Sequence, residues 1–337
     1  MANVFKRGST FYVEFYLGGR RVRRSLRTSR KSDALARKEA IERQVALGRY
    51  EPEVLNPPCA EFMESYLEWA RLHKAHNTVK NDEMWWRHLV EFCKPKRVAD
   101  IRPVDIERFK QDRRARGLAP SSVNDALRHL KAIFNRGPKL GLLSVENPVS
   151  GVEFLKVEKA PPKFLTAEEV EFLLKAATDQ STDMLVFCAL GVYAGLRRAV
   201  IVNARWEWFD FTQKIITVLS GEAFTIKNHE ARTIPLNAKL AAILAPLRRD
   251  EGYLIRPAKR PGTHVYRVEL QKPFREVAEA AGLGWITVHV LRHTFASRLA
   301  QANVSLYKIS KWLGHRDLKT TQVYAHLQTY DEAIDVL

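Results

Sequence analysis

Residues 289–326 read HVLRHTFASRLAQANVSLYKISKWLGHRDLKTTQVYAH. We expect this stretch to be helical, like most of the chain from residue 237 to its end. Gly314 is placed to end one helix in a left-handed cap, and Asp317 is placed to cap the next. Tyr324 would then lie on the first two turns of that second helix.

Histidine and arginine side chains in this stretch are spaced to bind an oxyanion. His289 and Arg292 are three residues apart, so on a helix they share one face. An imidazole and a guanidinium that converge there can hold the oxygens of one phosphate. His289 and His293, four residues apart, could instead hold zinc. No Glu follows His289 as in the zinc-protease motif, however, and no third ligand is near, so we predict no metal site.

Two patterns further upstream carry basic residues that could reach a phosphate. An apolar helix ends at Gly195-Leu196-Arg197-Arg198. An arginine after such a glycine can project its planar guanidinium into a cleft. Residues 223–228 and 231–236 read AFTIKN and ARTIPL, which predicts a hairpin with Lys227 near its tip. A lysine there could enter a groove and act as a general acid. Taken singly, such residues are more often surface arginines and solvated lysines.

Together the patterns fit one reaction, the cleavage of a phosphodiester by a tyrosine. That reaction needs a nucleophile, cationic donors for the pentacoordinate phosphorane and an acid for the leaving 5′ oxygen. A tyrosine is neutral at pH 7, because its reference pKa is about 10, so it needs cationic neighbours or a base. Two arginines and two histidines supply positive charge where negative charge develops, and each such donor typically contributes about 3–4 kcal/mol.

In order and spacing these residues resemble the tyrosine recombinase (phage integrase) family, and the resemblance covers residues 165–337 strongly. The family's arginine, lysine, His-x-x-Arg, Leu-Gly-His and tyrosine positions are all filled. The residues that would be catalytic are Arg197, Lys227, His289, Arg292, His315 and Tyr324.

The resemblance implies a role for each of these residues. Tyr324 would attack the scissile phosphate and form a 3′-phosphotyrosine, with release of a 5′-hydroxyl and without metal, ATP or any other cofactor. The two arginines and His315 would hold the non-bridging oxygens. His289 would assist proton transfer, and Lys227 would protonate the departing oxygen.

One position departs from the family pattern. Three residues after the first arginine the family usually has an acidic residue, and this chain has Val200. The usual carboxylate would orient the arginine rather than touch DNA. We therefore expect Arg197 to be less well oriented, or to be held by another acid, and activity to survive at a reduced level.

The chain is expected to be mainly α-helical with small β elements and to contain several domains, since 337 residues exceed one ordinary domain. Residues 1–50 predict a three-stranded sheet followed by a helix. Residues 59–150 predict a helical domain that resembles the core-binding (SAM-like) domain of the family. Residues 165–337 predict an α+β catalytic domain.

Positive charge is concentrated near the N-terminus. The net charge is +17, and residues 1–50 hold 13 Lys and Arg against 4 Asp and Glu. Such an excess predicts a polyanionic partner, double-stranded DNA here. Residues 1–50 also resemble the arm-binding module of integrases. The predicted DNA-binding residues are Arg20, Arg21, Arg23, Arg24, Lys80 and Lys131.

Other features exclude whole classes of protein. The three cysteines, at positions 59, 93 and 188, are far apart and outside any metal-ligand spacing, as in a reducing cytoplasm. No apolar run approaches the roughly 20 residues of a membrane span, and the first ten residues lack the apolar core of a secretory signal. We therefore expect a cytoplasmic, nucleoid-associated protein that has no membrane partner.

The resemblance also implies an assembly, a homotetramer on two DNA duplexes. It would exchange strands through a Holliday junction to integrate or excise a mobile element, aided by accessory DNA-bending or directionality proteins. Two other functions stay open. A type IB topoisomerase uses similar chemistry but relaxes supercoils as a monomer. A decayed integrase would bind its site in a salt-sensitive way but form no covalent product.

Overall fold

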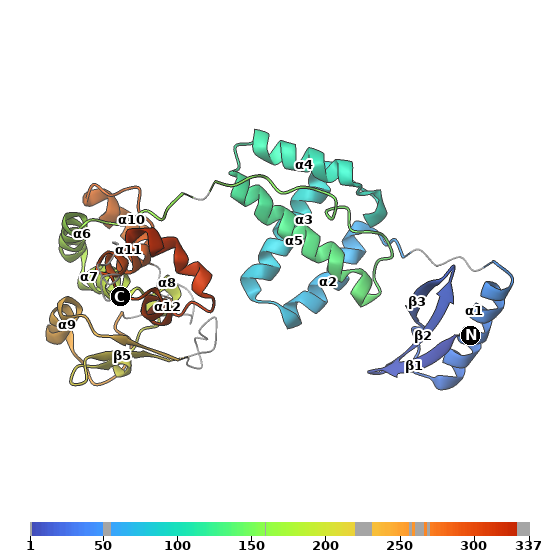
Figure 1. Ribbon diagram of the computed structural model, residues 1–337, viewed down its shortest axis with the longest axis horizontal. Coiled ribbons are helices and arrows are strands. Elements are labelled where there is room, and N and C mark those ends of the chain that lie inside the picture. The colour runs from blue at the N-terminus through green and yellow to red at the C-terminus, as the bar shows by residue number, and fades with distance from the viewer. Residues whose placement is uncertain are drawn as a thin grey trace, which may run out of the picture. The chain divides into compact units, whose positions relative to one another are not determined.

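The computed structural model describes residues 2–49, 55–158, 160–219, 231–255, 258–259, 266–267 and 270–328. The chain divides into two compact units, Met1–Glu158 and Lys159–Leu337 (Figure 1). Helices dominate both units, and the strands form small antiparallel sheets. The predicted fold class, mainly helical with small β elements, is therefore confirmed. The boundaries of the three predicted domains stay a prediction.

The first unit begins with a three-stranded sheet and a helix. Their bounds are β1 (Asn3–Arg7), β2 (Thr10–Leu17), β3 (Arg20–Ser25) and α1 (Lys31–Ala46). Val13 and Phe15 of β2 are buried together with Ala34 and Ile41 of α1. They face the helix together because alternate residues of a strand point to one side. The predicted three-stranded sheet and helix are thus observed, and Phe11 is partly buried against the same core.

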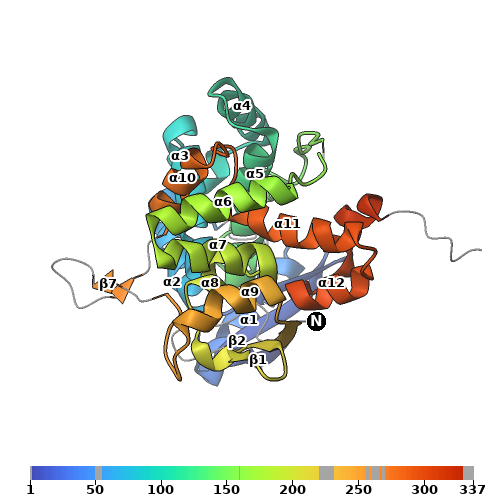
Figure 2. The same cartoon turned by 90° about the vertical axis from the view of Figure 1, so that its left-hand side faces the viewer.

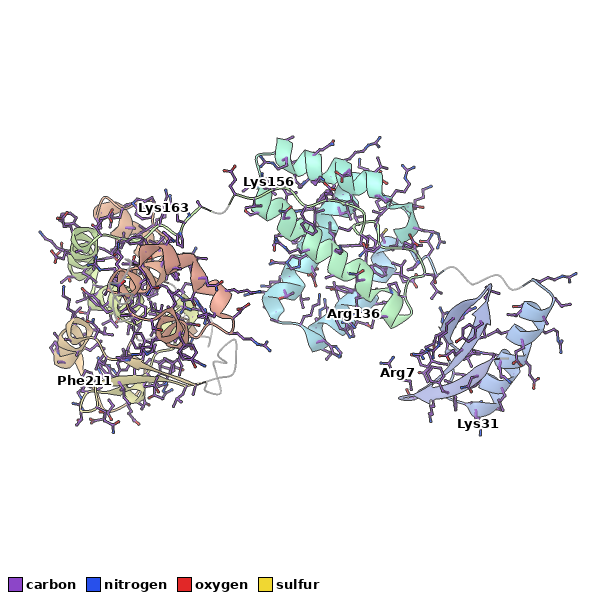
Figure 3. All side chains as sticks on the ribbon, viewed as in Figure 1. Arg7, Lys31, Arg136, Lys156, Lys163 and Phe211 are labelled. Carbon is purple, nitrogen blue, oxygen red and sulfur yellow. The ribbon has the colours of Figure 1, made fainter. Side chains whose placement is uncertain are left out.

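Residues 55–158 form helices around a second apolar core. Their bounds are α2 (Cys59–His73), α3 (His76–Cys93), η1 (Val98–Asp100), α4 (Pro103–Ala115), α5 (Pro120–Arg136) and η2 (Pro138–Leu140). The helical structure predicted for this region is therefore observed. Trp86 lies between Phe62 and Phe134, with ring centroids 5.3 and 5.6 Å away. Arg136 ends α5 with its guanidinium 4.1 Å from the ring centre of Trp69 (Figure 3).

A buried carboxylate links three of these helical segments. Asp82 of α3 is fully buried and accepts hydrogen bonds from the Tyr66 hydroxyl and from Lys74 Nζ, each at 2.7 Å. Nδ1 of His129, on α5, lies 2.5 Å from the other carboxylate oxygen. Burial, and then the bond to Asp82, raises the pKa of Tyr66. A charge this deep is tolerated only because each oxygen has a partner.

We predict that Asp82→Ala lowers the free energy of unfolding by about 3–5 kcal/mol, because it leaves a cation beside an empty buried site. Urea unfolding of the full chain measures the change. The matched control is Asp125→Ala, since Asp125 is half-exposed and its side chain lies 3.7 Å from His129. That change should cost less than about 1 kcal/mol. Equal midpoints for the two variants would contradict the role given to Asp82.

The second unit is built around α7 (Thr182–Ala194), which is apolar on all sides and almost wholly buried. A helix of that kind belongs in the centre of a fold. Figure 2 shows α6 (Ala167–Gln180) and α11 (Val288–Gln301) alongside it. A Cβ at Gly191 would lie 2.8 Å from the Leu291 side chain, so the glycine lets α11 approach closely. The other bounds are α8 (Arg198–Ile201), η3 (Trp206–Trp208), β4 (Phe209–Asp210), β5 (Ile215–Val218), β6 (Arg232–Pro235), α9 (Ala238–Leu244), η4 (Ala245–Leu247), β7 (Ala258–Lys259), β8 (Tyr266–Arg267), α10 (Gln271–Ala280), α12 (Leu306–Leu313), η5 (Leu318–Thr320) and η6 (Gln322–Leu327).

Local predictions in this unit have mixed outcomes. The capping box at the start of α6 forms, because Thr166 Oγ1 accepts from the Glu169 amide at 3.2 Å and the Glu169 carboxylate accepts from the Thr166 amide at 2.7 Å. The strand β4 is short, since Trp208 ends a 3₁₀ turn and only Phe209–Asp210 pair with β5. Of the hairpin predicted over residues 223–236, residues 223–230 lie outside the described residues, and Arg232–Pro235 form β6, which pairs with β5.

Candidate active site

Arg292 holds together three segments that are distant in sequence. Its side chain is 2% exposed and lies on α11. Its Nη1 donates to the Gly195 carbonyl and its Nη2 to the Leu313 carbonyl, both at 2.7 Å. These carbonyls lie at the ends of α7 and α12, where helical geometry leaves oxygens unpaired and slightly negative. One guanidinium therefore fixes the positions of two helix ends.

Glycine follows each of these helix ends for a steric reason. Gly195 and Gly314 have φ of 61° and 65°, the left-handed cap that the sequence predicted for Gly314. A Cβ at Gly195 would lie 2.4 Å from the Phe295 ring, and one at Gly314 would lie 2.8 Å from Nη1 of Arg232. Both turns thus need a residue without a side chain, and the second brings backbone close to a guanidinium.

Two further arginines lie near Arg292. Arg197 caps α8 and its Nη2 donates to the Gly314 carbonyl at 3.3 Å. Burial, followed by the charges of Arg197 and Arg232, lowers the pKa of Arg292 to about 9. Burial, followed by the charge of Arg197, lowers the pKa of Arg232 to about 10. All three remain cations at pH 7, and among the described residues no carboxylate forms an ion pair with any of them. Such a cluster is suited to bind an anion.

The histidines around this cluster are electrically neutral at pH 7. His315 Nδ1 lies 2.8 Å from the Thr321 hydroxyl, and His289 meets the ring of His293 edge-on with centroids 4.8 Å apart. Burial, followed by neighbouring positive charges, lowers the pKa of His293 and of His315 to about 4. The same causes lower the pKa of His289. In this neutral form they can donate hydrogen bonds without adding to the local positive charge.

Tyr324 is buried beside this cluster. It is 2% exposed and packs against Ala300, Ile309 and Leu313. Its hydroxyl lies 2.6 Å from Nδ1 of His293, and burial raises its pKa to about 12. The phenol is therefore protonated at neutral pH and shares its proton with an imidazole.

The α-helix expected around Tyr324 is not observed. Asp317 does cap a helical segment, since its carboxylate accepts from the Lys319 amide at 2.9 Å, but the segment consists of the 3₁₀ helices η5 and η6. The break lies at Thr321, which is fully buried and bonded to His315. The buried Thr321 thus separates the two 3₁₀ helices and contacts His315 of the site.

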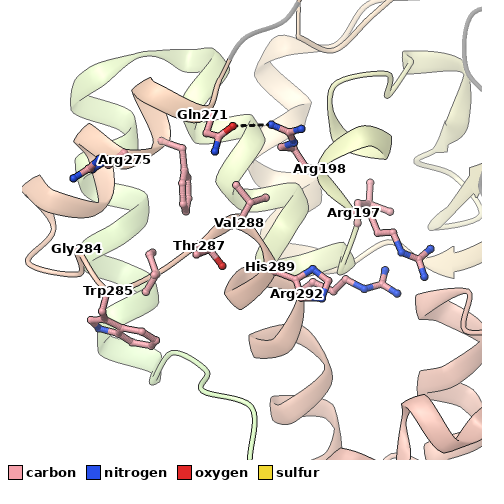
Figure 4. Close-up of a pocket in the computed structure, with 13 residues that line it drawn as sticks. Arg197, Arg198, Gln271, Arg275, Gly284, Trp285, Thr287, Val288, His289 and Arg292 are labelled. Atoms are coloured by element: carbon pink, nitrogen blue, oxygen red, sulfur yellow. Dashed lines mark hydrogen bonds between the residues drawn. The ribbon is translucent and has the colours of Figure 1, made fainter. Parts of the chain in front are cut away.

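A cavity of about 550 Å³ opens beside the arginines. Figure 4 shows Arg197, His289 and Arg292 on its wall, with Arg198 Nη1 donating to Gln271 Oε1 at 3.1 Å. The first arginine of the predicted set thus projects into a cleft, as its place after a helix-ending glycine suggested.

The structure brings five of the six predicted catalytic residues into the second unit's site, and the sixth, Lys227, lies outside the described residues. Sequence reasoning gave no role to Arg232 and considered His293 only as a zinc ligand. The described residues contain no group of three metal-binding side chains. His293 Nδ1 lies 2.6 Å from the Tyr324 hydroxyl, a contact that the sequence did not suggest.

The predicted DNA-binding residues lie in the first unit. Arg21 and Arg23 share a face of the sheet with Glu14, whose carboxylate accepts from Arg21 at 2.7 Å and from Arg23 at 2.8 Å. Arg24 lies opposite Val13, on the face that packs against α1, so β3 carries arginine on both faces as predicted. Arg20 begins β3, Lys80 is exposed on α3, and Lys131 is half-buried on α5. Their role in binding DNA stays a prediction.

Comparisons with protein families and with known proteins show what this chain is similar to. Residues 163–330 match the phage integrase family, and residues 61–142 match the N-terminal SAM-like domain of phage integrases. The tyrosine recombinase XerA of Pyrococcus furiosus is 30% identical over 281 residues, which cover 80% of this chain and 90% of that protein. A tyrosine recombinase of Pseudothermotoga lettingae is 29% identical over 240 residues, which cover 68% and 79%.

The chain belongs to the phage integrase family of tyrosine recombinases. It is therefore a site-specific recombinase that cleaves and rejoins DNA. Solved structures share the fold of this recombinase. A lambda integrase dimer bound to a core site has a TM-score of 0.62 at 16% identity, covering 98% of this chain and 97% of that one. The Tn1549 transposon integrase with a circular-intermediate DNA has a TM-score of 0.65 at 20% identity, covering 82% and 98%. No described helix of the recombinase is long and apolar enough to cross a membrane.

Val200 stands at the position that is usually acidic in the family, and its surroundings in this recombinase are apolar. Val200 is 3% exposed and belongs to the apolar core of the second unit. The expectation that another acid holds Arg197 finds no support among the described residues. A backbone carbonyl, that of Gly314, accepts from the Arg197 guanidinium instead.

We predict that the recombinase loses stability as the pH falls from about 6.5 towards 4. His293 and His315 have folded pKa values near 4, below the ordinary 6.5. The unfolded chain therefore binds more protons in that window, so acid favours unfolding, and the full stability is present above pH 6.5. Urea midpoints across the window measure this. The double variant His293→Gln/His315→Gln should show a flatter pH dependence, and an unchanged slope would contradict the assignment.

Proposed function

We propose that this recombinase integrates or excises a mobile DNA element, with Tyr324 as the nucleophile. The observation that carries the proposal is the cluster of Arg197, Arg232 and Arg292, which has no carboxylate partner among the described residues and lies beside a buried tyrosine. A phosphodiester supplies the missing negative charge, and its cleavage increases that charge at the phosphorane.

The reaction begins when the scissile phosphate enters the cavity beside Arg197 and His289. Arg197 and Arg292 donate to its non-bridging oxygens, as the cavity wall allows. His315 has its Nδ1 engaged with Thr321. Its Nε2 therefore remains for a third hydrogen bond to the phosphate. These donors are held by backbone carbonyls and by Thr321, so little reorganisation is needed when negative charge develops.

The attacking phenol must lose its proton. The Tyr324 hydroxyl already shares a hydrogen bond with His293, whose ring contacts His289. These imidazoles offer the proton a route as the Tyr324 oxygen bonds to phosphorus and the bond from phosphorus to the 5′ oxygen breaks. By the family resemblance, Lys227 protonates that 5′ oxygen. The ester keeps the bond energy, so a partner strand's 5′-hydroxyl can reverse the step without ATP or metal.

The wider assembly follows from the family. We propose a homotetramer that holds two duplexes and exchanges strands through a Holliday junction, helped by DNA-bending or directionality proteins. The lambda and Tn1549 integrase structures, both solved with DNA, support this use of the fold. The basic sheet of the first unit would grip accessory DNA sites. The protein would act on DNA in the cytoplasm, at the nucleoid.

We predict that the recombinase forms a covalent complex with a nicked duplex taken from the DNA that flanks its gene. The complex should resist SDS, be destroyed by protease and be absent in Tyr324→Phe. Arg197→Ala should lower cleavage at least about 100-fold while DNA affinity changes little, because its guanidinium acts mainly in the transition state. Specific binding without any adduct would favour the decayed integrase. Relaxation of an arbitrary supercoiled plasmid would favour a topoisomerase.

We also predict that the polar face of the N-terminal sheet binds phosphates. Arg21→Ala and Arg23→Ala should each reduce the salt dependence of DNA binding, with the slope of log K against log salt falling by about 0.9 per lost phosphate contact. Fluorescence anisotropy at several salt concentrations measures it. Lys38→Ala is the control, because Lys38 lies on α1 and pairs with Glu42. Slopes that change equally in all three variants would refute the assignment to this face.

A further inference from the structure

We propose that Arg232 is a further phosphate-binding residue of the active site, and that it donates Nε–H and Nη2–H to the scissile phosphate during cleavage. The inference rests on the proposed function and adds a third guanidinium to the two arginines of the predicted catalytic set. Three guanidinium groups, instead of two, would then bind the scissile phosphate.

Two buried donors of Arg232 carry this inference. Nε and Nη2 are both shielded from solvent, and neither has a hydrogen-bond partner among the described residues. Buried polar groups in folded proteins are almost always paired, and a buried charged group most of all. Buried guanidinium donors without a protein partner are therefore expected where a ligand supplies the acceptor. The acceptor must be anionic, because Arg197 and Arg292 already make the surroundings positive.

The position of Arg232 places it with the catalytic groups. It begins β6, and its Nη1 lies beside Gly314, close enough that a Cβ there would be 2.8 Å away. The carbonyl of the same glycine accepts from Arg197. The charge of Arg232 also contributes to the lowered pKa values of Arg292 and His315. A phosphate bound by those residues is therefore also close to the positive charge of Arg232.

A purely structural role would look different, as Arg292 shows. Two guanidinium nitrogens of Arg292 donate to carbonyls that end helices, so this side chain supports the fold even without DNA. The Nε and Nη2 of Arg232 make no comparable bond within the described part of the chain. Burying a cation without such bonds works against folding. We therefore infer that its benefit comes when DNA is bound.

The test compares two nicked duplexes that carry the cleavage site mapped by the Tyr324 adduct. One has the normal scissile phosphodiester, and the other has an uncharged methylphosphonate at that position. Full-length Arg232→Ala, Arg232→Lys and Arg232→Gln are compared with the wild type in single-turnover cleavage, DNA binding and thermal unfolding. Arg248→Ala is the matched control, because Arg248 is an exposed arginine of the same unit that lies over Phe211.

Arg232→Ala should cleave the phosphodiester about 100- to 1,000-fold more slowly, as expected for loss of one transition-state donor. Its DNA affinity should stay within about threefold of the wild type. Arg232→Lys should recover part of the rate, because lysine restores the positive charge but not the paired N–H donors of the planar guanidinium. On the methylphosphonate the loss should shrink to less than about tenfold, since no negative charge needs neutralising. A structural defect would slow both substrates equally.

Three outcomes would overturn the inference. They are equal losses on the two substrates, cleavage at the wild-type rate by Arg232→Ala, or a loss in Arg248→Ala as large as in Arg232→Ala. If the alanine variant does not fold, the comparison of the two substrates with Arg232→Lys and Arg232→Gln decides in the same way. A wild-type adduct that persists in Tyr324→Phe would overturn the proposed function itself. A Tyr324-dependent adduct that does not need Arg232 would overturn this inference alone.

Discussion

The active site depends on one buried guanidinium, that of Arg292, which joins the C-terminal ends of α7 and α12. Both helix ends carry a partial negative charge, so they stabilise a cation there and help it stay ionised in a poorly solvated place. The glycines that follow complete the two turns, and one of them brings its carbonyl to Arg197. The positions of the phosphate-binding groups are thus set by the way in which α7 and α12 end.

Positive charge in this site is left without a counter-ion among the described residues, and the histidines nearby stay neutral. This combination stores electrostatic free energy that an incoming phosphate releases. Arg197 has a hydrogen-bond acceptor although Val200 stands at the usually acidic position, because the Gly314 carbonyl accepts from its guanidinium. Where an arginine is oriented by backbone carbonyls, a side-chain carboxylate is not required to hold it. A nearby carboxylate would also offset part of the attraction for DNA.

Much of this arrangement could be predicted from sequence, because helix periodicity, caps and the i, i+3 relation of His289 and Arg292 are local. The contacts that could not be predicted join distant segments. The bond between His293 and Tyr324 spans 31 residues, and nothing in the local pattern around His293 indicates it. The same holds for Arg232, whose significance lies in burial and missing partners. The 3₁₀ geometry around Tyr324 is a further feature that local helix propensity did not predict.

The burial of Tyr324 has a consequence for the genome in which the recombinase works. A protein that searches for one site slides past very many identical phosphates, each of them chemically cleavable. A phenol that is 2% exposed and bonded to His293 is not available to those phosphates. Attack on any phosphate therefore requires the Tyr324 hydroxyl first to become accessible, and the free energy of that change counts against accidental nicks during the search.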